Sequence, residues 1–63
     1  MEKKEFESEF ERVKKKNGTV TVSGEGGFLI ADKYDFLTKG FIAFYLDGED
    51  AGVVRFTKID VVD

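Results

Sequence analysis

Residues 41–46 have the sequence FIAFYL, six apolar residues with no polar alternate. Such a run is typical of a strand covered on both faces, at the centre of a sheet. Asp47-Gly48 favours a turn after it, and residues 51–56 (AGVVRF) predict a second strand. The two strands should pair antiparallel across a hairpin loop of about four residues. We expect the rest of the chain to be arranged around this hairpin.

Only Thr57 and Lys58 separate the second strand from another β-branched run, residues 59–62. That corner has no Gly, Asn or Pro to make a relaxed hairpin, so we expect a sharp bend, flanked by Arg55 and Lys58. A strand that turns a corner without a loop is how small barrels close a sheet. The pattern therefore predicts a mainly β fold, a small five-stranded barrel over about residues 19–62.

The length of 63 residues indicates a single domain, residues 1–63. A chain this short buries only about 60% of the surface that its unfolded form exposes. Because it has no Cys or His for disulfides or a zinc site, we expect tight aromatic packing or, more strongly, a homo-oligomer. The apolar runs are too short for a membrane span or a signal peptide, so we expect no membrane partner and a cytoplasmic location.

Upstream, Phe6, Phe10 and Val13 fall at i, i+4 and i+7 and predict a helix over about residues 2–16 with one apolar stripe. Asn17-Gly18 should end it, because Gly adopts a left-handed conformation at low cost.

The alternating residues 19–23 (TVTVS) predict a half-buried strand, followed by a Gly-rich turn. Residues 28–39 fit two structures. The spacing of Ile30, Tyr34 and Leu37 also suits a helix, but we favour a strand that bends or breaks near Ala31-Asp32. As a strand, this segment would place four side chains on one face: Phe28, Ile30, Tyr34 and Phe36.

The chain offers few of the residue types that commonly carry out catalysis. The chain has no His or Cys, and neither Ser8 nor Ser23 lies in a nucleophile motif, so we expect no enzyme and no cofactor. Three acids near the hairpin, Asp47, Glu49 and Asp50, are more simply a solvated turn than a cation site. The turn of residues 24–27 (GEGG) is likewise a hairpin turn rather than a phosphate loop, since it contains an acid and is not followed by Lys.

Charge is unevenly distributed along the chain. The net charge is −3, with six basic against five acidic residues in 1–17 and four against eight in 18–63, so the barrel is a poor general nucleic-acid binder. Six residues are nonetheless candidates for contact with nucleic acid: Arg12, Lys14, Lys15 and Lys16 at the helix end, and Lys39 and Phe41 around Gly40. The simpler roles are dipole complementarity for the helix-end cations and core packing for Phe41.

The order of elements resembles the Sm-like family, and most of all its Hfq-like branch, over nearly the whole chain. The features that match are a helix with a basic end, residues 20–22, a Gly turn, a long bent strand, the apolar residues 41–46, and residues 53–62 in place of the second Sm motif. The signature positions themselves differ, since they hold Gly26, Asp32, Leu37-Thr38 and Phe56-Thr57. The resemblance implies an SH3/Sm-like barrel whose fourth and fifth strands pair between subunits in a ring.

Two functions follow from these observations. The first is a ring-forming Sm-like module that binds single-stranded RNA, with lysines on the backbone and an aromatic ring on a base. The second is a homo-oligomeric structural or protein-interaction barrel with no role in nucleic-acid binding, which the acidic balance favours.

Overall fold

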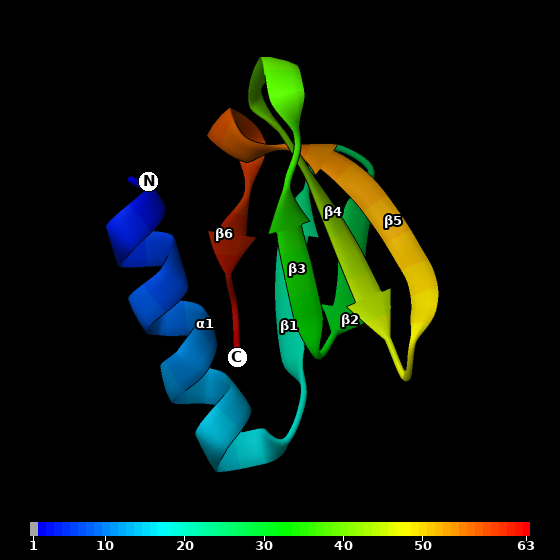
Figure 1. Cartoon of the computed structure of the whole chain (residues 1–63). Coiled ribbons are helices and arrows are strands. Elements are labelled where there is room, and N and C mark those ends of the chain that lie inside the picture. Colours follow the sequence, from blue (N-terminus) through cyan, green and yellow to red (C-terminus); the bar gives the residue numbers. More distant parts are fainter. Residues whose placement is uncertain (1) are drawn as a thin grey trace.

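The computed structural model describes residues 2–63 as one helix followed by six strands (Figure 1). The elements are α1 (Lys3–Asn17), β1 (Val20–Gly24), β2 (Gly27–Ala31), β3 (Lys33–Phe36), the 3-10 turn η1 (Thr38–Gly40), β4 (Phe41–Leu46), β5 (Glu49–Arg55), the 3-10 turn η2 (Phe56–Lys58) and β6 (Asp60–Val61). The prediction of a mainly β fold with an N-terminal helix is confirmed.

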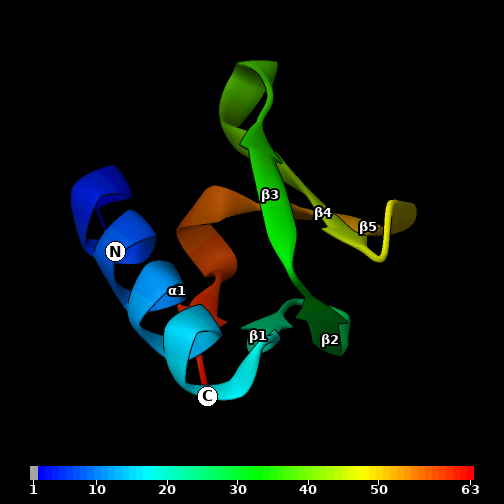
Figure 2. The ribbon, with the colours of Figure 1, turned by 60° about the horizontal axis from the view of Figure 1, so that its bottom comes forward.

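The strands form two antiparallel sheets, with orders β2-β1-β6 and β3-β4-β5. Figures 1 and 2 show α1 lying along one side of both sheets. Within residues 2–63 no strand pairing closes the two sheets on each other, so the predicted closed five-stranded barrel is wrong. The sharp bend predicted between the fourth and fifth strands is present as η2. It occupies three residues, and β6 has only two residues that pair with β1.

The bend within residues 28–39 divides this segment into β2 and β3, which confirms a strand broken at Asp32 over a helix. The break also changes which side chains face inward. Ala31 is buried before the break and Tyr34 packs on the core after it, whereas Phe28 and Ile30 are exposed. The prediction that Phe28 and Ile30 share a face with Tyr34 is therefore wrong, because one residue at the bend shifts the two-residue alternation.

The hairpin of β4 and β5 is tighter than predicted, with a loop of two residues rather than four. Asp47 (φ 53°) and Gly48 (φ 80°) both have positive φ, as a type I′ turn requires. A β-bulge then shifts the register, since Phe44 pairs with Gly52 and Tyr45 with Asp50. As predicted, β4 is the central strand of its sheet and has buried residues on both faces, Ile42 and Phe44 on one and Ala43 on the other.

The helix is bounded as predicted to within one residue. Gly18 is left-handed (φ 83°), and its N–H donates to the Lys14 carbonyl at 2.7 Å. The predicted stripe of Phe6, Phe10 and Val13 is fully buried and forms the core with residues of β1, β2 and β4 and with Ile59. α1 is therefore held by its apolar stripe, as a helix of this length requires.

Candidate nucleic-acid interface

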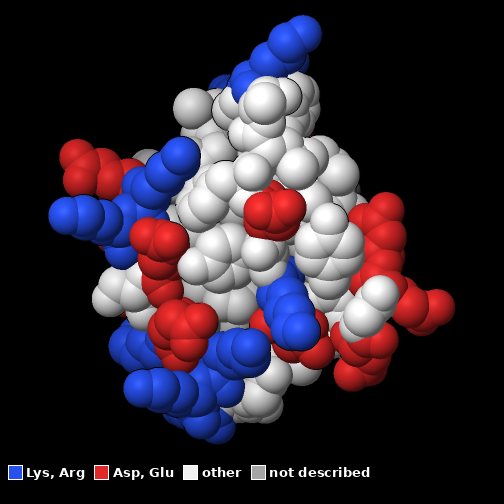
Figure 3. Space-filling view, viewed as in Figure 1, with Lys and Arg blue, Asp and Glu red and all other residues white. Residues whose placement is uncertain are grey.

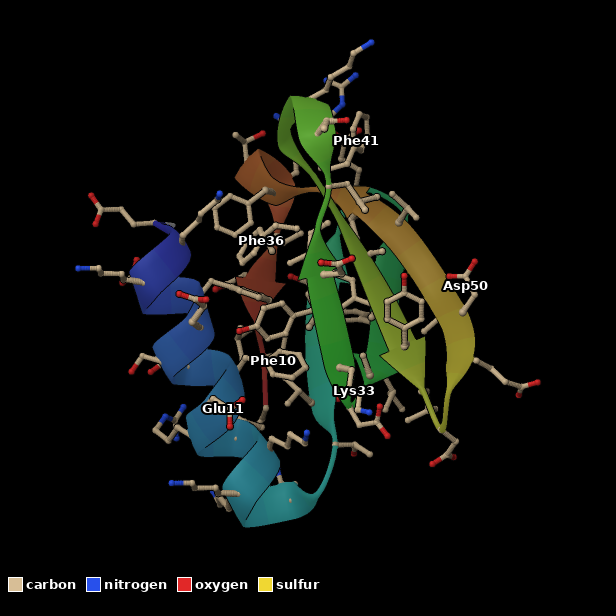
Figure 4. The ribbon with its side chains drawn as sticks, viewed as in Figure 1. Phe10, Glu11, Lys33, Phe36, Phe41 and Asp50 are labelled. Atoms are coloured by element: carbon tan, nitrogen blue, oxygen red, sulfur yellow. The ribbon has the colours of Figure 1, made fainter. Side chains whose placement is uncertain are left out.

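The six candidate residues form two separate groups at opposite ends of the molecule. Arg12, Lys14, Lys15 and Lys16, here called the helix-end cluster, occupy the last turns of α1. Lys39 and Phe41 lie at the connection between β3 and β4, at the other end (Figures 1 and 4). Figure 3 shows basic atoms gathered at the helix end, a basic side chain projecting from the opposite tip, and acidic atoms over the β4–β5 hairpin. The fold therefore keeps apart the two groups of candidates that the sequence offered, at the helix end and around Gly40.

The helix-end cluster is partly neutralised by acids. Arg12 makes a bidentate contact with Glu9, at 3.1 and 3.3 Å, and this hydrogen bond and charge raise the Arg12 pKa. Lys14 is half-buried, whereas Lys15 and Lys16 are exposed. Only these last two offer cations that project freely into solvent.

Lys14 lines a shallow groove of about 310 Å³ between α1 and the bend after β2. The groove is lined by Phe10, Glu11, Lys14, Asp32, Lys33 and Tyr34, so two cations face two carboxylates. Figure 4 shows Glu11 on α1 and Lys33 on β3 on either side of it. The groove therefore carries no excess of positive charge to attract a phosphate.

Asp32 in this groove has a structural role. Its N–H donates to the Tyr45 carbonyl at 2.8 Å, and its Oδ2 accepts from the Asp47 N–H at 3.2 Å. The side chain thus ties the bend between β2 and β3 to the β4–β5 turn.

The neighbours of Lys39 and Phe41 are two cations, Arg55 and Lys58. The sequence placed both cations at the sharp bend but did not indicate that they accompany Lys39 and Phe41. Phe41 pairs with Arg55 across β4 and β5, and the guanidinium carbon lies 5.9 Å from the Phe41 ring centroid. Lys39 lies in η1, before β4, and Lys58 lies in η2, after β5. We call Lys39, Phe41, Arg55 and Lys58 the strand-end surface. The sequence did not indicate the register of β4 against β5, which the two-residue loop and the bulge determine together.

The backbone holds this surface in place. Lys39 has positive φ (62°), as does Gly40 (79°), and the Leu37 N–H donates to the Phe41 carbonyl at 2.8 Å. This closes a tight turn that lifts the Lys39 side chain at the tip, while Phe41 remains half-buried. A second aromatic-cation contact lies on the helix, where Lys3 Nζ is 4.8 Å from the Phe36 centroid.

The described residues do not form the other kinds of site that the sequence raised. Within residues 2–63, no three Asp, Glu, His or Cys side chains converge as metal ligands, and the three hairpin acids are exposed. A second groove of about 250 Å³ is lined by the three glycines of the turn (Gly24, Gly26 and Gly27) with Phe28, Leu29 and residues 51–54 of β5. No helix among the described residues is long and apolar enough to cross a membrane.

Comparison with known proteins identified no relative of this chain. No family model matches the chain, and neither a curated protein nor a solved structure matches it.

Proposed function

We propose that this protein binds single-stranded RNA through the strand-end surface. The observation that carries the proposal is the Arg55 guanidinium over the Phe41 ring, 5.9 Å from its centroid, with Lys39 in the turn before β4 and Lys58 in the turn after β5. A planar cation over a half-buried ring, next to two flexible cations, is suited to an unstacked base and its neighbouring phosphates.

Local charge supports the proposal despite the acidic total. Residues 36–42 and 53–59, which form the two turns and the ends of β4 and β5 next to them, contain Lys39, Arg55 and Lys58 and no Asp or Glu. The acids lie on or beside α1 and β6, at the β4–β5 turn, on β3, and in the residues on either side of β2, and those closest along the chain to the strand-end surface are Asp35 and Asp60. The tips of the two turns therefore present positive charge to a phosphate, and at moderate salt acids more than about 10 Å away are screened.

The experiment is fluorescence anisotropy with uridine-rich and adenine-rich oligoribonucleotides over a range of salt concentrations. With three cations on phosphates, log K should fall against log salt with a slope of about −2, since each phosphate contact on a single strand contributes about −0.7. Phe41→Leu keeps the apolar packing but removes the stacking platform, and should weaken binding by roughly 5- to 100-fold.

A matched pair of variants locates the interface. Lys39→Gln with Lys58→Gln removes two cations from the strand-end surface, and Lys15→Gln with Lys16→Gln removes two from the helix-end cluster. The first pair should flatten the salt slope and the second should change it little. Binding that is absent at low salt, or that is lost only with the helix-end pair, would refute the proposal.

A second candidate function, a homo-oligomeric structural or protein-interaction module, is favoured by a separate observation. Phe28, Ile30 and Val53 are exposed on the strands, with 74%, 51% and 54% of their surface accessible. The ring implied by the Sm-like resemblance would pair β5 of one copy with β6 of the next, and both strands lie at sheet ends. Light scattering on a size-exclusion column tests for it, since a ring has several times the 7.1 kDa mass of the chain.

A further inference from the structure

Lys3 of α1 lies in a position that helix electrostatics do not explain. The first turn of a helix favours acids over cations, because the N-terminal end of the helix dipole is positive. Here Lys3 and Lys4 open α1 between Glu2 and Glu5, and within residues 2–63 Lys3 makes no ion pair. Its contact is with an aromatic ring instead, since the Lys3 Nζ lies 4.8 Å from the ring centroid of Phe36 on β3.

Phe36 is a half-buried ring that other rings hold in place. The rings of Phe6, Tyr34 and Phe56 meet it edge to face, with centroids 6.0, 5.6 and 5.4 Å away. Lys3 is an exposed, flexible side chain, so its ammonium lies over the ring in a weak contact that another group can replace. A fixed ring beneath a movable cation is suited to stacking on a base.

Phe36 adjoins both turns of the strand-end surface. It is the last residue of β3, just before the turn η1 that holds Lys39, and Phe56, which is 5.4 Å away, opens the turn η2. Phe36 and Phe41 lie on opposite faces of the sheet, because the cross-strand partner of Phe36 is Ile42, the residue next to Phe41. Figure 4 shows Phe36 on the side of the first turns of α1 and Phe41 beside η1. This end of the sheet therefore carries a ring with a cation over it on each face.

We propose that single-stranded RNA bound at the strand-end surface continues to Phe36, where a second base stacks and Lys3 moves from the ring to the adjoining phosphate. The inference rests on the proposed function and adds to it a second base site and the first turn of α1. The strand would pass over the end of the sheet from Phe41 to Phe36, along the cations of η1 and η2. A purely structural Lys3, which only covers Phe36, would affect stability but not the dependence of binding on RNA length.

The test is fluorescence anisotropy with short and long oligouridylates, of about three and about eight nucleotides, over a range of salt concentrations. The wild-type protein should bind the long oligomer roughly fivefold more tightly or better, because one further base stacks. Lys3→Gln should bind the short oligomer as the wild type does. With the long oligomer it should lose affinity, and its salt slope should be smaller in magnitude by about 0.7, the contribution of one phosphate contact.

Two further variants serve as controls. Lys4→Gln removes the same charge from the next residue, which lies over no ring within residues 2–63, and should bind both oligomers nearly as the wild type does. Phe36→Leu removes the ring and should weaken binding of the long oligomer only, with circular dichroism confirming that it is folded.

The outcomes separate this inference from the proposed function. A wild-type protein that binds neither oligomer at low salt would refute the proposed function, and the second base site with it. Wild-type binding that Lys3→Gln and Lys4→Gln reduce equally, or that Lys3→Gln reduces alike for both oligomers, would overturn the second base site and leave the strand-end surface in place.

Discussion

The rings of Phe6 and Tyr34 meet edge to face, with centroids 5.1 Å apart. Phe6 also contacts four other rings, those of Phe10, Phe36, Phe44 and Phe56, at 5.7 to 6.1 Å. One side chain of α1 therefore touches β3, β4 and η2 together. Aromatic pairs in this geometry contribute about 0.5–1.5 kcal/mol beyond their buried area.

Phe6→Ala should destabilise the protein by about 3–5 kcal/mol, through the cavity and the lost ring contacts. A domain of this size has roughly 3–9 kcal/mol in total, so the variant should be largely unfolded at room temperature. Phe6→Leu should cost less. Urea unfolding followed by circular dichroism measures both, and a loss below about 1 kcal/mol for the alanine variant would contradict the central position of Phe6.

Gly24→Ala should destabilise by about 1–3 kcal/mol, because the added Cβ would lie 2.5 Å from Cγ1 of Val54 on β5. Gly26→Ala is the matched control, since a Cβ there would have no neighbour within 4 Å and its φ is not positive. Adding Val54→Ala to Gly24→Ala should recover part of the loss. Thermal unfolding of the three variants would show the clash as a lowered melting temperature that the second substitution relieves.

Stability should fall at high pH through Tyr34. Burial raises the Tyr34 pKa above its ordinary value of 10.0, and the charges of Glu7 and Glu11 add to the effect. The folded protein thus holds the phenol proton more tightly than the unfolded chain does. The resulting stabilisation is complete below the unfolded pKa and is lost as pH rises through the folded pKa.

The Tyr34→Phe variant isolates this effect. Its free energy of unfolding should decline less steeply above about pH 10 than that of the wild type. Tyr45→Phe, which leaves Tyr34 in place, should retain the wild-type slope. Parallel slopes for wild type and Tyr34→Phe would show that folding does not raise the Tyr34 pKa.

Arg55 should contribute to RNA binding by its shape as well as its charge. Arg55→Gln should weaken binding and reduce the magnitude of the salt slope by about 0.7. Arg55→Lys keeps the charge but not the planar guanidinium that lies over Phe41, so it should weaken binding while leaving the slope unchanged. Anisotropy titrations at several salt concentrations separate the two outcomes. Equal behaviour of the lysine variant and the wild type would mean that Arg55 acts as a point charge alone.

The sequence by itself determined the elements whose signals are local. The stripe of Phe6, Phe10 and Val13 with Gly18 after it gave the helix, and the uninterrupted apolar run of residues 41–46 gave the central strand. These depend on neighbours a few residues apart, which periodicity and turn chemistry describe well.

Only the tertiary structure decided what depends on register. The one-residue break at Asp32 turns Phe28 and Ile30 outward, and the two-residue turn with its bulge brings Arg55 over Phe41. The tertiary structure also places the helix-end cluster at the opposite end of the molecule from Lys39 and Phe41. A shift of one residue in a strand moves every later side chain to the opposite face of the sheet. Sequence patterns do not locate such one-residue breaks and bulges, although these decide which side chains share a surface.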